Sequence, residues 1–205
     1  RGSLARLGCA GFLLVSPGND PRVCPAGAGR SIRRKRDNLG MDDWIDLSIV
    51  LNGTPRALKV RPNWTLLRVL REQLGITSVR EGCSEGQCGA CTVLLNGDPV
   101  PSCLLLAGTL EKAEIVTLEG LKKGDMLHPL QEAFHHFGAV QCGFCTPGMI
   151  LSAKALLDRN PNPSYEDIRE AISGNLCRCT GYLKPVEAIY QVSRGRTSPA
   201  PEENS

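Results

Sequence analysis

Eight of the ten cysteines in this 205-residue chain fall into two quartets, and no other feature of the sequence limits its fold as strongly. Ten cysteines make up about 5% of the chain, which is below the density expected of a small disulfide-stabilised scaffold. They are also clustered in short CxxC and CxC spacings, which favour metal sites in a reducing, cytoplasmic compartment. The two quartets therefore predict metal or metal-cluster binding. Their members are Cys83, Cys88, Cys91 and Cys103, followed by Cys142, Cys145, Cys177 and Cys179.

The first quartet has the spacing of a plant-type ferredoxin, with four residues between its first two cysteines and two before the third. Three glycines among them permit the tight backbone and the close approach to sulfur that a cluster needs, and nearby amide N–H groups can stabilise negative sulfur. A hairpin turning at residues 96–98 returns Cys103 to this loop. The pattern predicts a [2Fe–2S] cluster, and the alternative is zinc, which also takes four thiolates. The glycines are Gly82, Gly86 and Gly89.

The second quartet consists of two close pairs, Cys142-x2-Cys145 and Cys177-x-Cys179, separated by a predicted helical hairpin. Each pair lies at the end of a helix, and short loops at one end of a bundle can bring four thiolates together. From spacing alone, this site suits either a [2Fe–2S] cluster or zinc. Arg178 lies between two of the cysteines, where it either offsets the negative charge of a cluster or is simply exposed to solvent.

Residues 42–118 have the pattern of a compact α+β domain. Alternating apolar residues and Asn52-Gly53 predict a first hairpin, and a second hairpin turns at residues 96–98. Between the hairpins, Thr65 can cap a helix that ends at Gly75. The predicted strands contain residues 45–51, 58–60, 92–95, 100–104 and 115–118.

Residues 119–195 switch to helical periodicity and predict a second, all-helical domain. Ser164 with Asp167 resembles a capping box at the start of the third of its four helices. The predicted helices contain residues 130–137, 149–157, 168–172 and 185–192.

The two ends of the chain have the composition of tails. We expect a disordered or artefactual extension over residues 1–41, with Cys9 and Cys24 outside any site, and a tail over residues 196–205. The formal charge of +3 arises in the first 40 residues, which carry eight basic and two acidic side chains. Because their basic stretch Arg33–Arg36 lacks interleaved aromatic residues, we predict no nucleic-acid partner. No run of about 18 apolar residues predicts a membrane span.

Three cysteine-containing segments resemble the small iron–sulfur subunit of the molybdenum hydroxylases, the family of xanthine dehydrogenase, aldehyde oxidoreductase and carbon monoxide dehydrogenase. The resemblance covers residues 42–195 and includes all eight cysteines in order. The segments are EGCSEGQCGAC at residues 81–91, QCGFCTPG at residues 141–148 and GNLCRCTGY at residues 174–182.

This resemblance implies a β-grasp, ferredoxin-like [2Fe–2S] domain over residues 42–118 and a four-helix [2Fe–2S] domain over residues 119–195. It implies an electron-transfer subunit of an oxidoreductase complex, without substrate chemistry of its own. A large subunit would bind the molybdopterin cofactor, and a medium subunit would bind FAD. At molybdenum, water would supply the oxygen that enters a C–H bond of a heterocycle or an aldehyde.

The same resemblance implies a direction for the electrons. They would leave molybdenum one at a time through the helical-domain cluster, which lies nearer to molybdenum in the family. The ferredoxin-type cluster would then pass them to FAD or to an external acceptor. Gln141 would contact the pterin in the large subunit; its alternative role is a buried amide that caps a helix.

Other side chains are expected to be structural, and no catalytic set presents itself. We expect the histidines, His128, His135 and His136, at surface or interface positions, and Trp44 and Trp64 in packing. Two further functions stay open. A structural zinc-binding interaction module would contain zinc and no iron, whereas a free-standing ferredoxin-like shuttle would form no stable complex with larger subunits.

Overall fold

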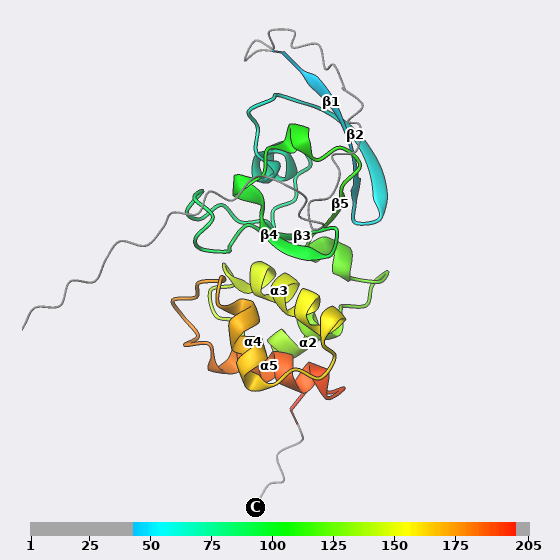
Figure 1. Cartoon of the computed structure of the whole chain (residues 1–205). Coiled ribbons are helices and arrows are strands. Elements are labelled where there is room, and N and C mark those ends of the chain that lie inside the picture. The colour runs from blue at the N-terminus through cyan, green and yellow to red at the C-terminus, as the bar shows by residue number, and fades with distance from the viewer. Residues whose placement is uncertain (1–42, 200–205) are drawn as a thin grey trace, which may run out of the picture. The chain divides into compact units, whose positions relative to one another are not determined.

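The structure, a computed structural model, describes residues 43–199 of the chain (Figure 1). Within them, strands and short helices make up residues 45–116, here called the sheet part. Longer helices make up residues 129–193, here called the helical part. The expected extension over residues 1–41 lies outside the described residues, as does most of the expected tail over residues 196–205.

The strands of the sheet part form one mixed sheet in the order β2-β1-β5-β3-β4. β1 pairs parallel with β5, and the other neighbours pair antiparallel. Both hairpins turn on an Asn-Gly pair, Asn52-Gly53 and Asn96-Gly97, with positive φ at every position, as a type I′ turn requires. The predicted α+β, β-grasp fold is confirmed. The strands are β1 (Ile45–Leu51), β2 (Thr54–Val60), β3 (Thr92–Leu95), β4 (Asp98–Pro101) and β5 (Glu114–Val116).

The helix predicted after Thr65 begins where expected but is α-helical only at its start. Oγ1 of Thr65 accepts a hydrogen bond of 3.3 Å from the amide of Arg68 and so caps α1 (Leu66–Arg68). The chain then widens into a π-helix, η1 (Val69–Gln73), before Gly75 takes a φ of +66°. Over so short a segment, hydrophobic periodicity does not distinguish these two helix types: α1 buries Leu66 and Leu67, and η1 buries Val69 and Leu70.

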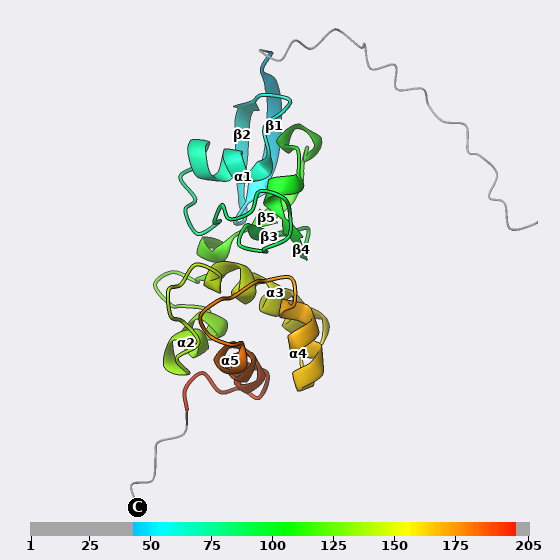
Figure 2. The same ribbon diagram turned by 90° about the vertical axis from the view of Figure 1, so that its left-hand side faces the viewer.

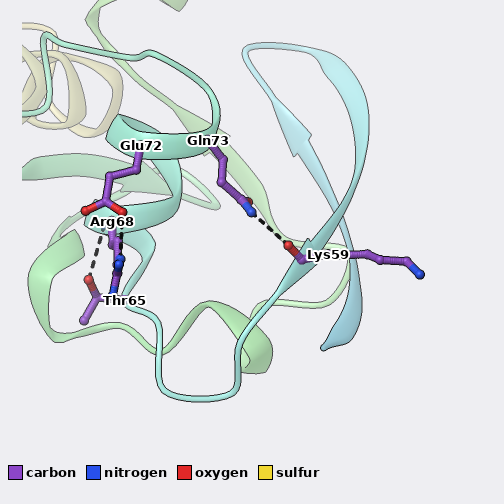
Figure 3. A network of polar contacts seen from close by, with 5 residues as sticks. All are labelled: Lys59, Thr65, Arg68, Glu72 and Gln73. Atoms are coloured by element: carbon purple, nitrogen blue, oxygen red, sulfur yellow. Dashed lines mark hydrogen bonds and ion pairs between the residues drawn. The ribbon is translucent and has the colours of Figure 1, made fainter. Parts of the chain in front are cut away.

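Side-chain interactions stabilise this helical segment internally and connect it to the sheet, as Figure 3 shows. Arg68 and Glu72 form an ion pair of 2.8 Å along the helix surface. Nε2 of Gln73 donates a hydrogen bond of 2.9 Å to the carbonyl oxygen of Lys59 in β2. The helix is thereby held beside the edge strand of the sheet.

Proline ends β4 earlier than predicted. The strand stops at Pro101, whose nitrogen cannot donate to a sheet. The amide and the hydroxyl of Ser102 then bond to the carbonyl oxygen of Cys91, at 3.2 and 2.8 Å, which turns the chain. Cys103 therefore lies in a 3₁₀ turn and not on the predicted strand. The 3₁₀ helices are η2 (Ser102–Leu104), η3 (Ala107–Thr109) and η4 (Leu118–Leu121).

Strand β3 contributes to two hydrophobic cores. Val93 is fully buried in the core of the sheet part, together with Leu70 and Ile115. Leu94, on the opposite face of the strand, packs into the core of the helical part with Phe134. Because successive side chains of a strand point to opposite faces, this one strand joins both cores.

The helical part follows the predicted pattern closely. Ser164 and Asp167 form the predicted capping box of α4, each side chain bonding to the other's amide. Helix α3 contacts β3 and β4, and α2, α4 and α5 lie on its other sides (Figures 1 and 2). The helices are α2 (Pro129–His136), α3 (Thr146–Arg159), α4 (Tyr165–Ile172) and α5 (Leu183–Ser193). None of the helices in residues 43–199 has the length and apolar character needed to cross a membrane.

Candidate metal centres

The first quartet combines three cysteines of one irregular loop with a cysteine of a helical turn. Residues 80–91 form neither helix nor strand, and they connect η1 to β3. Cys91 and Cys103 are buried at the inner side of this loop, whereas Cys83 and Cys88 lie nearer to the surface. The site is therefore open to solvent on one side and bounded by the core of the sheet part on the other.

Backbone amides point at the sulfur of Cys83. Its Sγ accepts hydrogen bonds from the amides of Glu85, Gln87 and Cys88, at 3.4, 3.3 and 3.4 Å. These bonds, with that from Glu85 the strongest, lower the pKa of Cys83 to about 7. The thiolate, which is the form that binds metal, is thereby favoured near neutral pH, as the glycine-rich sequence predicted.

Glycines are required in this loop for two different reasons. Gly86 and Gly89 have φ values of +78° and +68°, which other residues adopt with strain. Gly82 has no such φ, but a Cβ there would lie 2.8 Å from the sulfur of Cys88. The loop can therefore wrap around sulfur only with glycine at these positions.

The sulfurs of the first quartet meet in pairs. The thiols of Cys83 and Cys88 are hydrogen-bonded to each other, and so are those of Cys91 and Cys103. Burial, and then the hydrogen bond with Cys91, raises the pKa of Cys103 to about 11. Cys83 is thus easier to ionise than Cys103, so a bound cation would be needed to draw the proton from Cys103.

The second quartet is assembled at helix ends in the helical part. Cys145 is the N-cap residue of α3, and Cys142 precedes it. Cys177 and Cys179 lie in the loop between α4 and α5. The sulfurs of Cys142 and Cys179 are 3.5 Å apart, and those of Cys145 and Cys177 also interact. The loop prediction is confirmed, because both pairs come from short segments at one end of the helices.

Burial and hydrogen bonding again give two thiols of this quartet different pKa values. Burial raises the pKa of Cys145 to about 12. Cys177 is also partly buried, but its sulfur contacts the hydroxyl of Thr180 at 3.1 Å and accepts from the Thr180 amide at 3.4 Å. These bonds outweigh burial and lower the pKa of Cys177 to about 7. The hydroxyl of Tyr182 accepts from the Cys177 amide at 2.8 Å and so anchors the loop.

The donor set fits two-metal clusters. All eight cysteines are free thiols. Within residues 43–199 no three His, Cys, Asp or Glu side chains converge closely enough to hold a single metal ion; each quartet presents two pairs of thiols instead. A [2Fe–2S] cluster has two irons and four cysteine ligands, so one thiol pair per iron matches this arrangement.

Other predicted site residues lie at the surface. Gln141 and Arg178 are both exposed, each next to a cysteine of the second quartet. Gln141 is therefore not the buried helix cap that was its alternative role. His135 and His136 are exposed, as expected, whereas His128 caps α2 by accepting the Leu130 amide at its Nδ1.

Sequence reasoning missed the contact between the two sites. The amide of Leu176 donates a hydrogen bond of 2.9 Å to the carbonyl oxygen of Cys88. The buried side chain of Asn175 donates to the carbonyl oxygen of Gly89 at 3.0 Å. The two donors directly precede Cys177, and no local pattern in the sequence marks residues that bond across such a separation.

Comparison with protein families matches both halves of the described chain. Residues 49–118 match the family described as a 2Fe-2S iron-sulfur cluster binding domain. Residues 117–190 match the family described as a [2Fe-2S] binding domain. Both quartets therefore lie within iron–sulfur domains, which supports the iron–sulfur interpretation over a zinc module.

Curated relatives cover most of the chain. The nicotinate dehydrogenase small FeS subunit of Eubacterium barkeri is 56% identical over 151 residues, which span 73% of this chain and 96% of the relative. The xanthine dehydrogenase iron-sulfur-binding subunit of Escherichia coli O157:H7 is 47% identical over 158 residues, or 76% of this chain and 99% of the relative. Among solved structures, quinoline 2-oxidoreductase from Pseudomonas putida 86 aligns with a TM-score of 0.71 and 44% identity, covering 74% of this chain and 97% of that chain.

Proposed function

This chain belongs to the small iron–sulfur subunits of the molybdenum hydroxylase family, and from that membership we propose that its eight paired thiols are the ligands of two [2Fe–2S] clusters. It is the electron-transfer subunit of an oxidoreductase complex, whose molybdenum cofactor and FAD belong to partner subunits. Each cluster, when bound, supplies storage for one electron. The proposal depends above all on the pairwise contacts of the thiols within each quartet.

We assign one iron to each pair of contacting thiols. Cys83 with Cys88, and Cys91 with Cys103, would hold the first cluster. Cys142 with Cys179, and Cys145 with Cys177, would hold the second. The amides directed at Cys83 and the hydroxyl and amide of Thr180 at Cys177 stabilise negative sulfur, and such bonds help to set a cluster's reduction potential.

The chain's own contribution is to hold the two sites close together. The hydrogen bond from Leu176 to Cys88 connects the loop of one quartet to a ligand of the other. Covalent bonds and this one hydrogen bond give a continuous route between the two ligand sets. Electron tunnelling weakens steeply with distance, so a fixed, short connection is what a relay between two sites requires.

We place the second quartet toward molybdenum, as the family resemblance implies. Gln141, Cys142 and Cys179 are exposed together at one edge of the helical part, where a partner subunit can reach them. Gln141 would contact the pterin there, and Arg178, also exposed, would offset negative charge at the same edge. The hydroxylation itself, at a heterocycle or an aldehyde, would take place in the large subunit.

The proposed complex contains two further subunits. A large molybdopterin-binding subunit and a medium FAD-binding subunit are the partners, and the cytoplasm is the location. The exposed cysteines at the second site favour a chain covered by a partner over a free-standing shuttle, because an uncovered cluster is open to oxidation and solvent.

Co-expression of the full chain with the proteins encoded by its neighbouring genes, followed by purification of the complex, tests this function. We expect three subunits on a sizing column and about four iron atoms per small subunit, the number in two [2Fe–2S] clusters. Reduction with dithionite should give two distinct EPR signals, and substrate should reduce both. A colourless complex that contains zinc and no reducible iron would contradict the proposal.

A further inference from the structure

Asn175, Thr92 and Ser152 form a buried polar cluster where the sheet part contacts the helical part. Only 2% of Asn175 is exposed. Its Nδ2 donates to the carbonyl oxygen of Gly89 at 3.0 Å and to Oγ1 of Thr92 at 3.3 Å, both in the sheet part. Its Oδ1 accepts from Oγ of Ser152 in α3, at 2.7 Å. The two N–H donors of the side-chain amide thus bond to the sheet part, and its oxygen accepts a hydrogen bond from the helical part.

Two glycines let the backbones approach each other around this amide. A Cβ at Gly89 would lie 2.2 Å from the carbonyl oxygen of Gly174 and 2.7 Å from Nδ2 of Asn175. A Cβ at Gly148 would lie 2.4 Å from the carbonyl oxygen of Gly89 and 2.8 Å from the same Nδ2. Three segments therefore meet backbone to backbone, with no room for a methyl group.

Each of these segments carries cysteines of a quartet. Gly89 follows Cys88 directly, and Asn175 precedes Cys177 by two residues. Gly148 lies in the first turn of α3, whose N-cap is Cys145. A single side chain therefore fixes the loop of the first quartet against both segments of the second.

We propose that Asn175 is a positioning residue that sets the separation and orientation of the two clusters and thereby the rate of electron transfer between them. The proposal rests on the proposed function, which supplies the two clusters. It adds a residue outside the proposed ligand set, whose side chain hydrogen-bonds to Gly89, Thr92 and Ser152. Its role is exerted through the backbone of Gly89 and through the helix that holds Ser152.

The hydrogen bonds that remain when Asn175 is replaced distinguish a role in positioning the clusters from a role in folding. The Gly89 carbonyl oxygen also accepts from the amide and the hydroxyl of Thr92, at 3.2 and 2.7 Å. It keeps these partners when Asn175 is replaced, so the first loop retains its internal bonds. What is lost are the side-chain hydrogen bonds of Asn175 between the two parts, while the bond from the Leu176 amide to Cys88 remains. Each cluster should therefore still assemble in its own loop.

Two variants test the proposal in the intact complex. Asn175→Ala removes the amide, and Asn175→Asp keeps its shape but cannot donate to the Gly89 carbonyl when ionised. Asn160→Ala is the matched control, because Asn160 caps the far end of α3 and bonds only within its own turn, to Asn162. The measurements are iron content, the EPR signal of each reduced cluster, the magnetic splitting between the two, and the rate of electron transfer from one to the other.

Both Asn175 variants should keep about four iron atoms per chain, the content of two [2Fe–2S] clusters, together with both individual signals. Their magnetic splitting should change and their inter-cluster transfer should slow severalfold, while Asn160→Ala matches the wild type. Unchanged splitting and rate would overturn the proposal, and so would loss of a cluster, which would make Asn175 a folding residue. A wild-type complex without two signals would instead contradict the proposed function itself.

Discussion

The amide of Leu176 donates its hydrogen bond to the carbonyl oxygen of Cys88 over 2.9 Å, and Leu176 immediately precedes Cys177. One hydrogen bond thus links a proposed ligand of the first cluster to the neighbour of a proposed ligand of the second. The side chain of Leu176 is 58% exposed, and the residue contributes to this link through its backbone amide.

Leu176→Pro removes the amide hydrogen and with it this bond. We expect electron transfer between the clusters to slow severalfold and stability to fall by about 1 kcal/mol, the usual worth of one hydrogen bond. Rapid-mixing reduction of the complex, with each cluster followed separately, measures the rate. Leu176→Ala keeps the amide and should behave as the wild type, and equal rates in the proline and alanine variants would exclude the through-bond route.

Gly82→Ala should remove the first cluster selectively. The new Cβ would lie 2.8 Å from the sulfur of Cys88, and both the loop and the sulfur would have to shift. We expect iron to fall from about four to about two atoms per chain, with one of two EPR signals retained. Gly174→Ala is the matched control, because a Cβ there meets no atom within 4 Å and its φ is not positive. Retention of both signals in Gly82→Ala would contradict the proposed ligand set.

The sequence predicted features that depend on neighbours along the chain. The spacing of the cysteines within each loop, both Asn-Gly turns and the Ser164–Asp167 box are all local patterns, and the turns and the box lie where predicted. No local pattern marked a role for Asn175, because its partner Gly89 lies 86 residues away in the sequence. Cys103 was placed on a strand because the periodicity does not show the bonds of Ser102 to Cys91, eleven residues earlier, that turn the chain.

The capping box of α4 should contribute measurably to stability. Ser164 Oγ accepts from the amide of Asp167 at 3.2 Å, and replacing such a cap with alanine costs about 1 kcal/mol. Ser164→Ala should therefore lower the thermal midpoint by a few degrees, as followed by circular dichroism. Ser193→Ala removes a hydroxyl that bonds only to a carbonyl within α5, and it should change the midpoint much less. Equal losses in the two variants would be inconsistent with the capping role.

Glu119 should make stability depend on pH in the acid range. Burial raises the pKa of its carboxyl, but hydrogen bonds from Ser78 and Thr117, at 2.6 and 2.7 Å, outweigh this and lower it below the usual 4.5. The ionised group therefore stabilises the fold above about pH 4.5, and this contribution is lost as the pH falls through the lowered pKa. Glu119→Gln should have a lower thermal midpoint than the wild type at pH 7, and the difference should disappear in acid. A difference that stays constant with pH would refute this role.

Gln141 offers a test of which cluster faces molybdenum. Its side chain is exposed beside Cys142, so Gln141→Ala should leave the fold, the iron content and both EPR signals intact. If Gln141 contacts the pterin, substrate should reduce the second cluster severalfold more slowly in the variant, while dithionite reduces it at the wild-type rate. Gln87 is a matched control, an exposed glutamine beside the first quartet whose amide hydrogen bond to Cys83 survives the change to alanine. Slowing in Gln87→Ala but not in Gln141→Ala would reverse the proposed order of the two clusters, because it would place the first quartet against the molybdenum subunit.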